Sequence, residues 1–234
     1  MSLLSFRLTC ILIAPLLFGM YPEILLTSGK EEKIDRLNEL TSAYLYKDIL
    51  QLSGIKYADK IRKLLQMLAF QIGNTVSLNQ IARALEMSQE TVANYIDLLG
   101  KGFIIFRLFG FSGNLRKEVV KMNKIYFYDL GVRNNLINNF NPLSIRNDVG
   151  MLWENFLVIE RVKKKQYQRT HVNTYFWRTY TGAELDYLEE ANGVLSGYEI
   201  KWGKAAKAPT SWLETYDNAR FERITQENFL TFIS

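Results

Sequence analysis

Hydrophobic residues in the first half of the chain recur at helical spacing. Between Glu31 and Leu52 they return every three or four positions, which predicts an amphipathic helix that Ser53-Gly54 ends. Ser77 and Gln80 have the spacing of a capping box and mark a second helix start. The pattern as a whole predicts four helices, over residues 31–52, 58–73, 77–85 and 89–99.

Two strand-like runs follow these helices. Phe103–Phe109 and Lys124–Tyr128 are rich in β-branched and aromatic residues. Two short helices joined by a brief turn and followed by two strands are typical of a winged helix. Asn138–Asp148 has little periodicity and contains an Asn-Pro step, so we place a domain boundary there.

The pattern changes again after that boundary. Val149–Lys165 reads as a helix that ends in three lysines, and Val172–Trp177 reads as a strand. Asn192-Gly193 lies between two alternating runs and predicts a hairpin. A helix over residues 209–218 and a last strand over residues 229–232 complete the prediction.

Alternation along the hairpin predicts which side chains share a face of the sheet. In the first strand, one face would carry Glu184, Asp186 and Leu188, and the other Leu185, Tyr187 and Glu189. In the second strand, Glu199 and Lys201 would share a face. Acidic and basic side chains therefore stand where a half-buried strand normally carries neutral ones.

Composition limits the chemistry that these residues can perform. The chain has 234 residues, of which 48% are hydrophobic, enough for one sizeable core or, as we expect, for two small folded domains. One cysteine excludes an intramolecular disulfide, and one histidine excludes a zinc cluster and leaves little room for a Ser-His-Asp triad. Any catalysis must therefore rest on carboxylates and lysines.

Positive charge is concentrated in one region. The formal net charge is +5, and residues 100–146 hold eight basic residues against two acidic ones. Such clustering favours contacts with phosphates, so DNA is the expected partner. A solvated basic loop or a surface that docks another protein is the alternative. The candidate nucleic-acid-binding residues are Arg107, Arg116, Lys117, Lys121 and Lys124.

The amino terminus carries a hydrophobic run. Leu8–Met20 has no charged residue and resembles the apolar core of a secretory signal, but it is too short to span a bilayer. Pro15 interrupts it and no small-residue cleavage pattern follows. We expect a buried or strand-like remnant in a cytoplasmic protein with no membrane partner, and keep export as the alternative.

Three residues of the hairpin have a spacing known from nucleases. An Asp on one strand, Glu-x-Lys on the next and a Glu on a preceding helix form the arrangement of the PD-(D/E)XK nucleases. Asp186 and Glu199 would bind Mg²⁺ or Mn²⁺, Lys201 would face the phosphate, and Glu154 could add a ligand through water. The alternative is a structural cluster of ion pairs, because lysines often pair with carboxylates across strands.

Several motifs in the same order resemble a bacterial and archaeal family of AAA-type ATPases. They are Tyr44–Ile49, Asn114–Glu118, Lys124–Gly131 with Arg133-Asn134, Trp153–Phe156 and Trp177–Thr179. The resemblance covers Gly19–Ser234 and implies a lid, a winged helix and a restriction-endonuclease-like domain after an ATPase core. It also implies that Glu154, Asp186, Glu199 and Lys201 occupy the nuclease-like positions. The sequence contains no phosphate-binding G-x-x-x-x-G-K-[ST] motif, so we do not expect it to bind ATP; a separate ATPase chain is a candidate partner.

The sequence thus predicts an α+β protein built from a helical lid segment, a winged helix and a PD-(D/E)XK nuclease-like α/β domain with a small mixed sheet. The expected function is that of a DNA-binding, nuclease-like module, with a catalytically inactive DNA- or protein-binding module as the alternative. The expected divisions are an atypical hydrophobic start (1–20), the lid-like segment (21–57), the winged helix (58–140), a linker (141–148) and the carboxyl-terminal domain (149–234).

Overall fold

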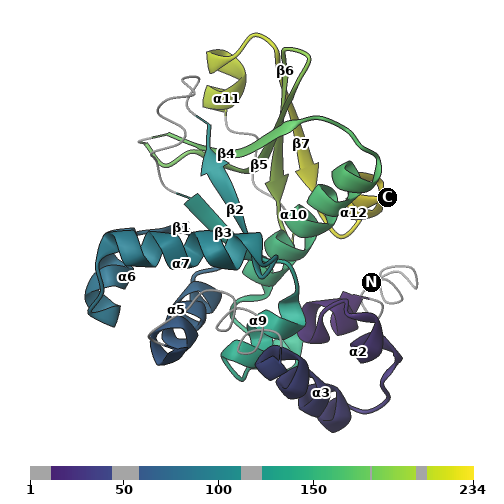
Figure 1. Cartoon of the computed structure of the whole chain (residues 1–234). Helices are drawn as coiled ribbons and strands as arrows, with labels where there is room; N and C mark the ends of the chain where they lie inside the picture. The colour runs from purple at the N-terminus through teal and green to yellow at the C-terminus, as the bar shows by residue number, and fades with distance from the viewer. Residues whose placement is uncertain (1–11, 44–57, 112–122, 180, 204–209) are drawn as a thin grey trace.

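A computed structural model of the chain describes residues 12–43, 58–111, 123–179, 181–203 and 210–234. The fold is of the α+β class, with one mixed sheet surrounded by helices (Figure 1). Two of the motifs, Tyr44–Ile49 and Asn114–Glu118, lie outside the described residues. The candidate DNA contacts Arg116, Lys117 and Lys121 therefore do too.

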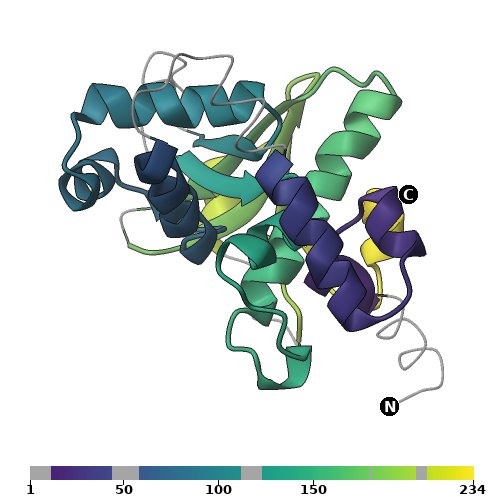
Figure 2. The same cartoon turned by 60° about the horizontal axis from the view of Figure 1, so that its bottom comes forward.

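The hydrophobic segment near the amino terminus is helical over residues 12–18 and packs into the protein. Leu16 is fully buried, and the side-chain amide of Asn134 donates hydrogen bonds of 2.9 Å to the carbonyls of Leu16 and Leu17. No helix in the described part of the chain is long and apolar enough to cross a membrane. Helices α2 (Pro22–Leu26) and α3 (Lys30–Ser42) follow and pack against each other, and α3 lies beside α9 (Leu130–Leu136) (Figure 2).

The next elements have the order of a winged helix. They are α5 (Ala58–Phe70), β1 (Thr75–Val76), α6 (Leu78–Leu85), α7 (Gln89–Lys101), β2 (Ile105–Gly110) and β3 (Asn123–Phe127). Ser77 and Ser88 cap α6 and α7 by accepting hydrogen bonds from backbone N–H groups three residues on. Glu86 takes a left-handed conformation (φ 52°) in the turn between the two helices. The strands pair in the order β1-β3-β2, all antiparallel, as in a winged helix.

The segment between residues 137 and 148 contains a short 3-10 helix, η2 (Leu143–Ile145), and is fastened at its end. Asp148 accepts hydrogen bonds from Arg133 and Arg146 at 2.6 to 2.7 Å, and all three side chains are almost fully buried. Because buried charges are stable only when paired, this contact holds the segment against α9.

The carboxyl-terminal elements are α10 (Val149–Tyr167), β4 (Asn173–Arg178), β5 (Glu184–Ala191), β6 (Val194–Ile200), α11 (Thr210–Thr215), β7 (Ala219–Ile224) and α12 (Phe229–Ile233). The predicted strand over residues 229–232 is wrong, because this segment is helical. Phe229 and Phe232 are buried three residues apart, which is helical and not strand spacing. The last strand is β7, which pairs in parallel with β6.

A single sheet runs through the whole molecule in the order β1-β3-β2-β4-β5-β6-β7. The winged-helix strands join the carboxyl-terminal strands where β2 pairs in parallel with β4, at Phe109 and Gly110. One large core lies between the sheet and helices α5, α6, α7, α9, α10 and α12. A second core, on the other face, places Trp212 of α11 against Trp177 and Leu185 (Figure 1). The small mixed sheet predicted for the carboxyl-terminal domain is thus the larger part of a seven-stranded sheet.

Strand β5 contains an irregularity that changes its faces. Tyr175 pairs with Leu188 and Trp177 pairs with Leu185, so two steps along β4 match three along β5. Such a bulge places two successive residues on one face. Asp186 and Tyr187 accordingly both face α10, whereas Leu185 and Leu188 share the face of α11. The strict alternation that the sequence predicted would instead place Asp186 and Tyr187 on opposite faces, and Leu185 and Leu188 likewise.

Candidate functional site: a buried carboxylate and lysine network

The structure brings three of the predicted site residues together at the end of the hairpin. Asp186 lies on β5, Glu199 near the end of β6 and Lys201 just beyond it. The Lys201 Nζ atom is 3.5 Å from Asp186 Oδ2 and 3.5 Å from Glu199 Oε1. The Lys201 side chain is 41% exposed, whereas both carboxylates are largely buried. Lys201 therefore links the two acids.

The two acids do not share one face of the sheet. Tyr198 and Ile200 belong to the core on the α10 side, so Glu199 between them points to the opposite side. Asp186 faces α10, and its Oδ2 accepts a hydrogen bond of 2.8 Å from the Ile200 backbone N–H. The sequence predicted that Asp186 and Glu199 would hold one metal ion together; in the structure they meet through the Lys201 ammonium.

A second lysine occupies the centre of the carboxylates that face α10. Lys124 Nζ lies 2.6 Å from Glu184, 3.2 Å from Glu154 and 3.6 Å from Asp186. Lys124 is 2% exposed, so the structure places it in the interior and not on a surface that DNA can reach. The Tyr126 hydroxyl donates a 2.7 Å hydrogen bond to Glu154. Lys124, Tyr126 and Glu184 were not among the predicted members of this site.

One signal in the sequence could have identified two of the missed residues. Lys124 and Tyr126 are two positions apart on a strand and hence share a face, and the other residues on β3 are largely apolar. A lysine within a buried strand needs an anionic partner. That partner comes from α10 and β5, which are distant in sequence, so only the folded structure identifies it.

Burial and neighbouring charges shift the pKa values in this network. Burial, and then the charge of Asp186, raise the pKa of Glu154 to about 7, although Lys124 and Tyr126 act in the other direction. Burial alone would lower the pKa of Lys124, but the carboxylates of Glu154, Asp186 and Glu184 hold it well above its ordinary value. Lys124 is therefore a permanent cation at the centre of the cluster.

The described part of the network contains as many acidic as basic side chains. Two arginines complete it, since Arg178 lies 3.6 Å from Glu184 and Arg223 lies 4.0 Å from Glu199. Four acids thus meet four cations: Glu154, Glu184, Asp186 and Glu199 with Lys124, Lys201, Arg178 and Arg223.

This arrangement does not fit the Mg²⁺ or Mn²⁺ ion that a PD-(D/E)XK site implies. A divalent cation needs several free oxygen ligands at roughly 2.0 to 2.6 Å. Here the Lys124 ammonium lies among the carboxylates of the α10 face and would repel such an ion. Within the part of the chain that the structure describes, no three His, Cys, Asp or Glu residues are arranged to hold a metal ion.

Of the basic residues that suggested DNA binding, those that the structure describes each pair with an acidic side chain. Besides Lys124, Arg133 and Arg146 are buried against Asp148. Arg107 is 3.7 Å from Asp97 of α7, and Lys101 is 2.7 Å from the same carboxylate. The exposed side of α7, the helix that a winged helix would insert into a groove, carries Gln89, Glu90, Asn94, Asp97 and Lys101, with more acids than bases.

Two parts of the chain match known protein families. Residues 12–143 match a domain of unknown function, DUF8612, and residues 149–227 match another, DUF4143. No solved structure matches the chain.

Curated relatives are all uncharacterized proteins and are longer than this chain. Rv2008c of Mycobacterium tuberculosis is 29% identical over 185 residues, 78% of this chain and 41% of the relative. MJ1544 of Methanocaldococcus jannaschii is 28% identical over 148 residues, 61% of this chain and 32% of the relative. The chain thus spans about two fifths of the length of the first relatives that it matches. Because the DUF8612 match covers more than half of its residues, the chain belongs to the DUF8612 family and carries a DUF4143 domain behind it.

Proposed function

We propose that the chain is a catalytically inactive binding module of an AAA-type ATPase family. The DUF8612 and DUF4143 matches and the motifs that resemble this ATPase family support the assignment. The nuclease-like domain then serves as a scaffold, and the partner is a protein, with a separate ATPase chain as the first candidate.

The position of Lys124 carries the proposal. A hydrolytic metal site keeps its carboxylates available for the ion, but here the ammonium of a lysine that is 2% exposed lies 2.6 to 3.6 Å from three of them. Removing a buried cation from its carboxylates is costly, so the network is a stable structural feature.

The network also joins the two matched segments. Lys124 lies on β3 of the winged helix, Glu154 on α10 and Glu184 on β5. The winged helix is therefore tied to the carboxyl-terminal domain by ion pairs as well as by the continuous sheet. A fixed orientation between two domains suits a module that presents one continuous surface to a partner.

A protein partner is favoured over DNA by the charge of α7. A helix that enters a DNA groove needs basic or amide side chains on its exposed side, and neutralised phosphates supply most of the affinity. On α7 the carboxylates of Glu90 and Asp97 are exposed, and Lys101 and Arg107 both pair with Asp97.

A cleavage assay tests the proposal. Supercoiled plasmid is incubated with the wild-type chain in Mg²⁺, in Mn²⁺ and in chelator, beside the Asp186→Asn variant. We expect the same background of nicking in every lane. Metal-dependent cleavage that disappears in Asp186→Asn and in Lys201→Met would overturn the proposal.

DNA binding is measured separately by the anisotropy of a labelled duplex at two salt concentrations. The proposal expects weak binding that is unchanged when Arg116 and Lys117 are replaced by glutamate. Loss of binding in this variant, with a smaller salt dependence, would make DNA the partner.

A metal-dependent nuclease is the second candidate, favoured by the half-exposed Lys201. Its ammonium lies between Asp186 and Glu199 at the end of the hairpin, where a phosphate could approach from solvent. The cleavage assay above decides between the two candidates.

A further inference from the structure

A cavity of about 550 Å³ lies on the α10 side of the sheet, away from the carboxylate network. The pairing of β2 with β4 is confined to Phe109 and Gly110, and the two strands separate toward their amino ends. Phe106 of β2 and Thr174 of β4 line the cavity at this fork, and the end of α10 closes it. Its volume is in the range of small-molecule sites.

The wall of this cavity combines an apolar part with a positive one. Phe106, Val162 and Val172 supply apolar surface, and Lys165 and Arg169 supply positive charge. Among the described residues that line it, none is acidic. The Lys165 ammonium is 3.1 Å from Glu189, but that carboxylate is also paired with Arg161, so the group of three keeps a positive excess.

The pKa of Lys164, next to Lys165, is lowered by burial and by the same positive charges. Burial, and then the charges of Arg161 and Lys165, lower the pKa of Lys164. Each of these residues belongs to the last turns of α10, so the end of this helix is electropositive where it meets the cavity.

A buried hydroxyl at the wall lacks a partner. The Tyr187 side chain is fully buried, and its hydroxyl makes no hydrogen bond with any described residue. Thr174 lines the same cavity, and its hydroxyl partly offsets the rise that burial causes in the pKa of Tyr187. No hydrogen bond of normal geometry, however, joins the two hydroxyls. Buried polar groups are nearly always satisfied, so an unsatisfied one at a cavity wall indicates a missing ligand or water.

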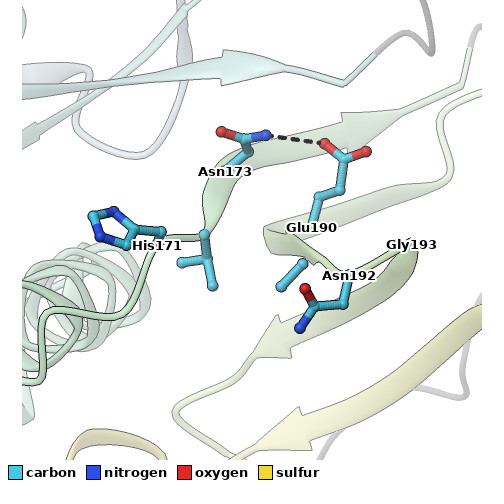
Figure 3. Close-up of a pocket in the computed structure, with 7 residues that line it drawn as sticks. His171, Asn173, Glu190, Asn192 and Gly193 are labelled. Atoms are coloured by element: carbon cyan, nitrogen blue, oxygen red, sulfur yellow. Dashed lines mark hydrogen bonds between the residues drawn. The ribbon is translucent and has the colours of Figure 1, made fainter.

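The adjoining hollow has a different character. It shares His171 and Val172 with the cavity, but Glu190 also lines it. Figure 3 shows the Glu190 carboxylate turned toward Asn173, whose side-chain amide donates to it at 3.4 Å, and away from His171. This acid lines the adjoining hollow and is not among the residues that line the cavity.

We propose that this cavity binds a small amphipathic anion, one phosphate or carboxylate group on an apolar or aromatic body. Arg169 and Lys165 attract the anionic group, Tyr187 donates its hydroxyl hydrogen to the ligand, and Phe106 with the two valines holds the apolar body. The bulge of β5 makes this site, because it turns Tyr187 to the α10 face beside Asp186.

The cationic end of the site lies away from Glu154 of the carboxylate network, although Tyr187 directly follows Asp186 in β5. An α-helix rises about 1.5 Å per residue, so Glu154 and Lys165 lie roughly 16 Å apart along α10. The inference therefore does not depend on whether the network is catalytic.

Calorimetric titration of the full chain with 1-naphthyl phosphate tests the inference, with 1-naphthoate and neutral 1-naphthol as parallel ligands. We expect saturable binding of the phosphate, the carboxylate or both, and at least tenfold weaker binding of 1-naphthol. Tyr187→Phe keeps the ring and its packing and should weaken binding about fivefold. Arg169→Gln removes an exposed charge and should weaken it about tenfold.

Arg83→Gln is the matched control, since Arg83 is an exposed arginine of α6 that does not line the cavity. Its affinity should equal that of the wild type, and thermal unfolding shows that each variant is folded. Three results would overturn the inference: no saturable binding of either anion, wild-type affinity in both Tyr187→Phe and Arg169→Gln, or equal binding of 1-naphthol.

Discussion

At the scale of single residues, Lys124 determines how the site is interpreted. From the sequence we predicted that Lys124 contacts DNA at the surface, because it lies in a basic region of the chain. In the fold it is a buried counterion for Glu154, Glu184 and Asp186. A chain-wide charge count cannot make this distinction, because it contains no information on burial.

Replacing Lys124 should therefore destabilise the fold strongly. Lys124→Met keeps most of the volume but leaves three carboxylates without their cation, which should cost about 3 to 5 kcal/mol of unfolding free energy. Urea denaturation followed by tryptophan fluorescence measures this change. The control is Lys101→Met, because Lys101 is exposed and pairs only at the surface of α7; it should change stability by less than about 0.5 kcal/mol. Equal effects of the two variants would contradict the burial of the Lys124 charge.

The raised pKa of Glu154 predicts a pH dependence of stability. The unfolded carboxyl ionises near its ordinary pKa of 4.5 and the folded one at about 7. Between these values the folded state binds more protons, so stability should fall as pH rises, by at most about 3 kcal/mol. Denaturation at pH 4.5 to 7.5 should show this fall, and Glu154→Gln should lose it. A slope that is the same in both proteins would assign the effect to another group.

At the scale of helices and strands, the sequence predicted correctly those features that depend on neighbouring residues alone. Ser77 and Ser88 cap their helices as serines before amphipathic runs do, and Asn192-Gly193 turns the hairpin with positive φ at both residues. Asp186, Glu199 and Lys201 were correctly expected to lie close together. Local patterns were thus enough to locate the hairpin and its charged end.

Long-range packing explains what the sequence did not predict. The bulge at Asp186 and Tyr187 arises from pairing with β4 and breaks an alternation that looked regular. Phe229 and Phe232 have strand-like propensity, yet α12 buries both against α10 and the hairpin. The cation that fills the carboxylate cluster comes from β3, some thirty residues before Glu154.

The helix over residues 12–18 owes its position to two glycines. A side chain on Gly131 would place its Cβ 2.1 Å from the Phe18 carbonyl oxygen, and one on Gly19 would meet Asp129 at a similar distance. Since a backbone carbonyl cannot move aside easily, Gly131→Ala should displace residues 12–20 from α9. Hydrogen exchange followed by mass spectrometry should show faster exchange in peptides that cover these residues.

Gly150 provides the control for this prediction. It lies in α10, and a Cβ added there would meet no described atom within 4 Å, so Gly150→Ala should be neutral or stabilise the helix by about 0.5 to 1 kcal/mol. Exchange in residues 12–20 that is as slow in Gly131→Ala as in Gly150→Ala would show that the close contact is not needed.

At the scale of the whole molecule, the winged helix and the carboxyl-terminal strands share one sheet and one large core. The network around Lys124 ties β3, α10 and β5 together within that core. The charged side chains of the network pair with one another inside the protein. Under the function proposed above, this shared framework holds a binding surface in place, and we expect no phosphodiester cleavage from it.

Calorimetric titration of the wild-type chain with Mg²⁺ asks directly whether Lys124 or a metal ion occupies the carboxylate cluster. We predict no saturable heat at millimolar Mg²⁺, because Lys124 already neutralises the carboxylates, whereas Lys124→Met should gain stability from the metal. Saturable Mg²⁺ binding by the wild type that is lost in Asp186→Asn would contradict the account, since it would show that the ion and not the lysine fills the site.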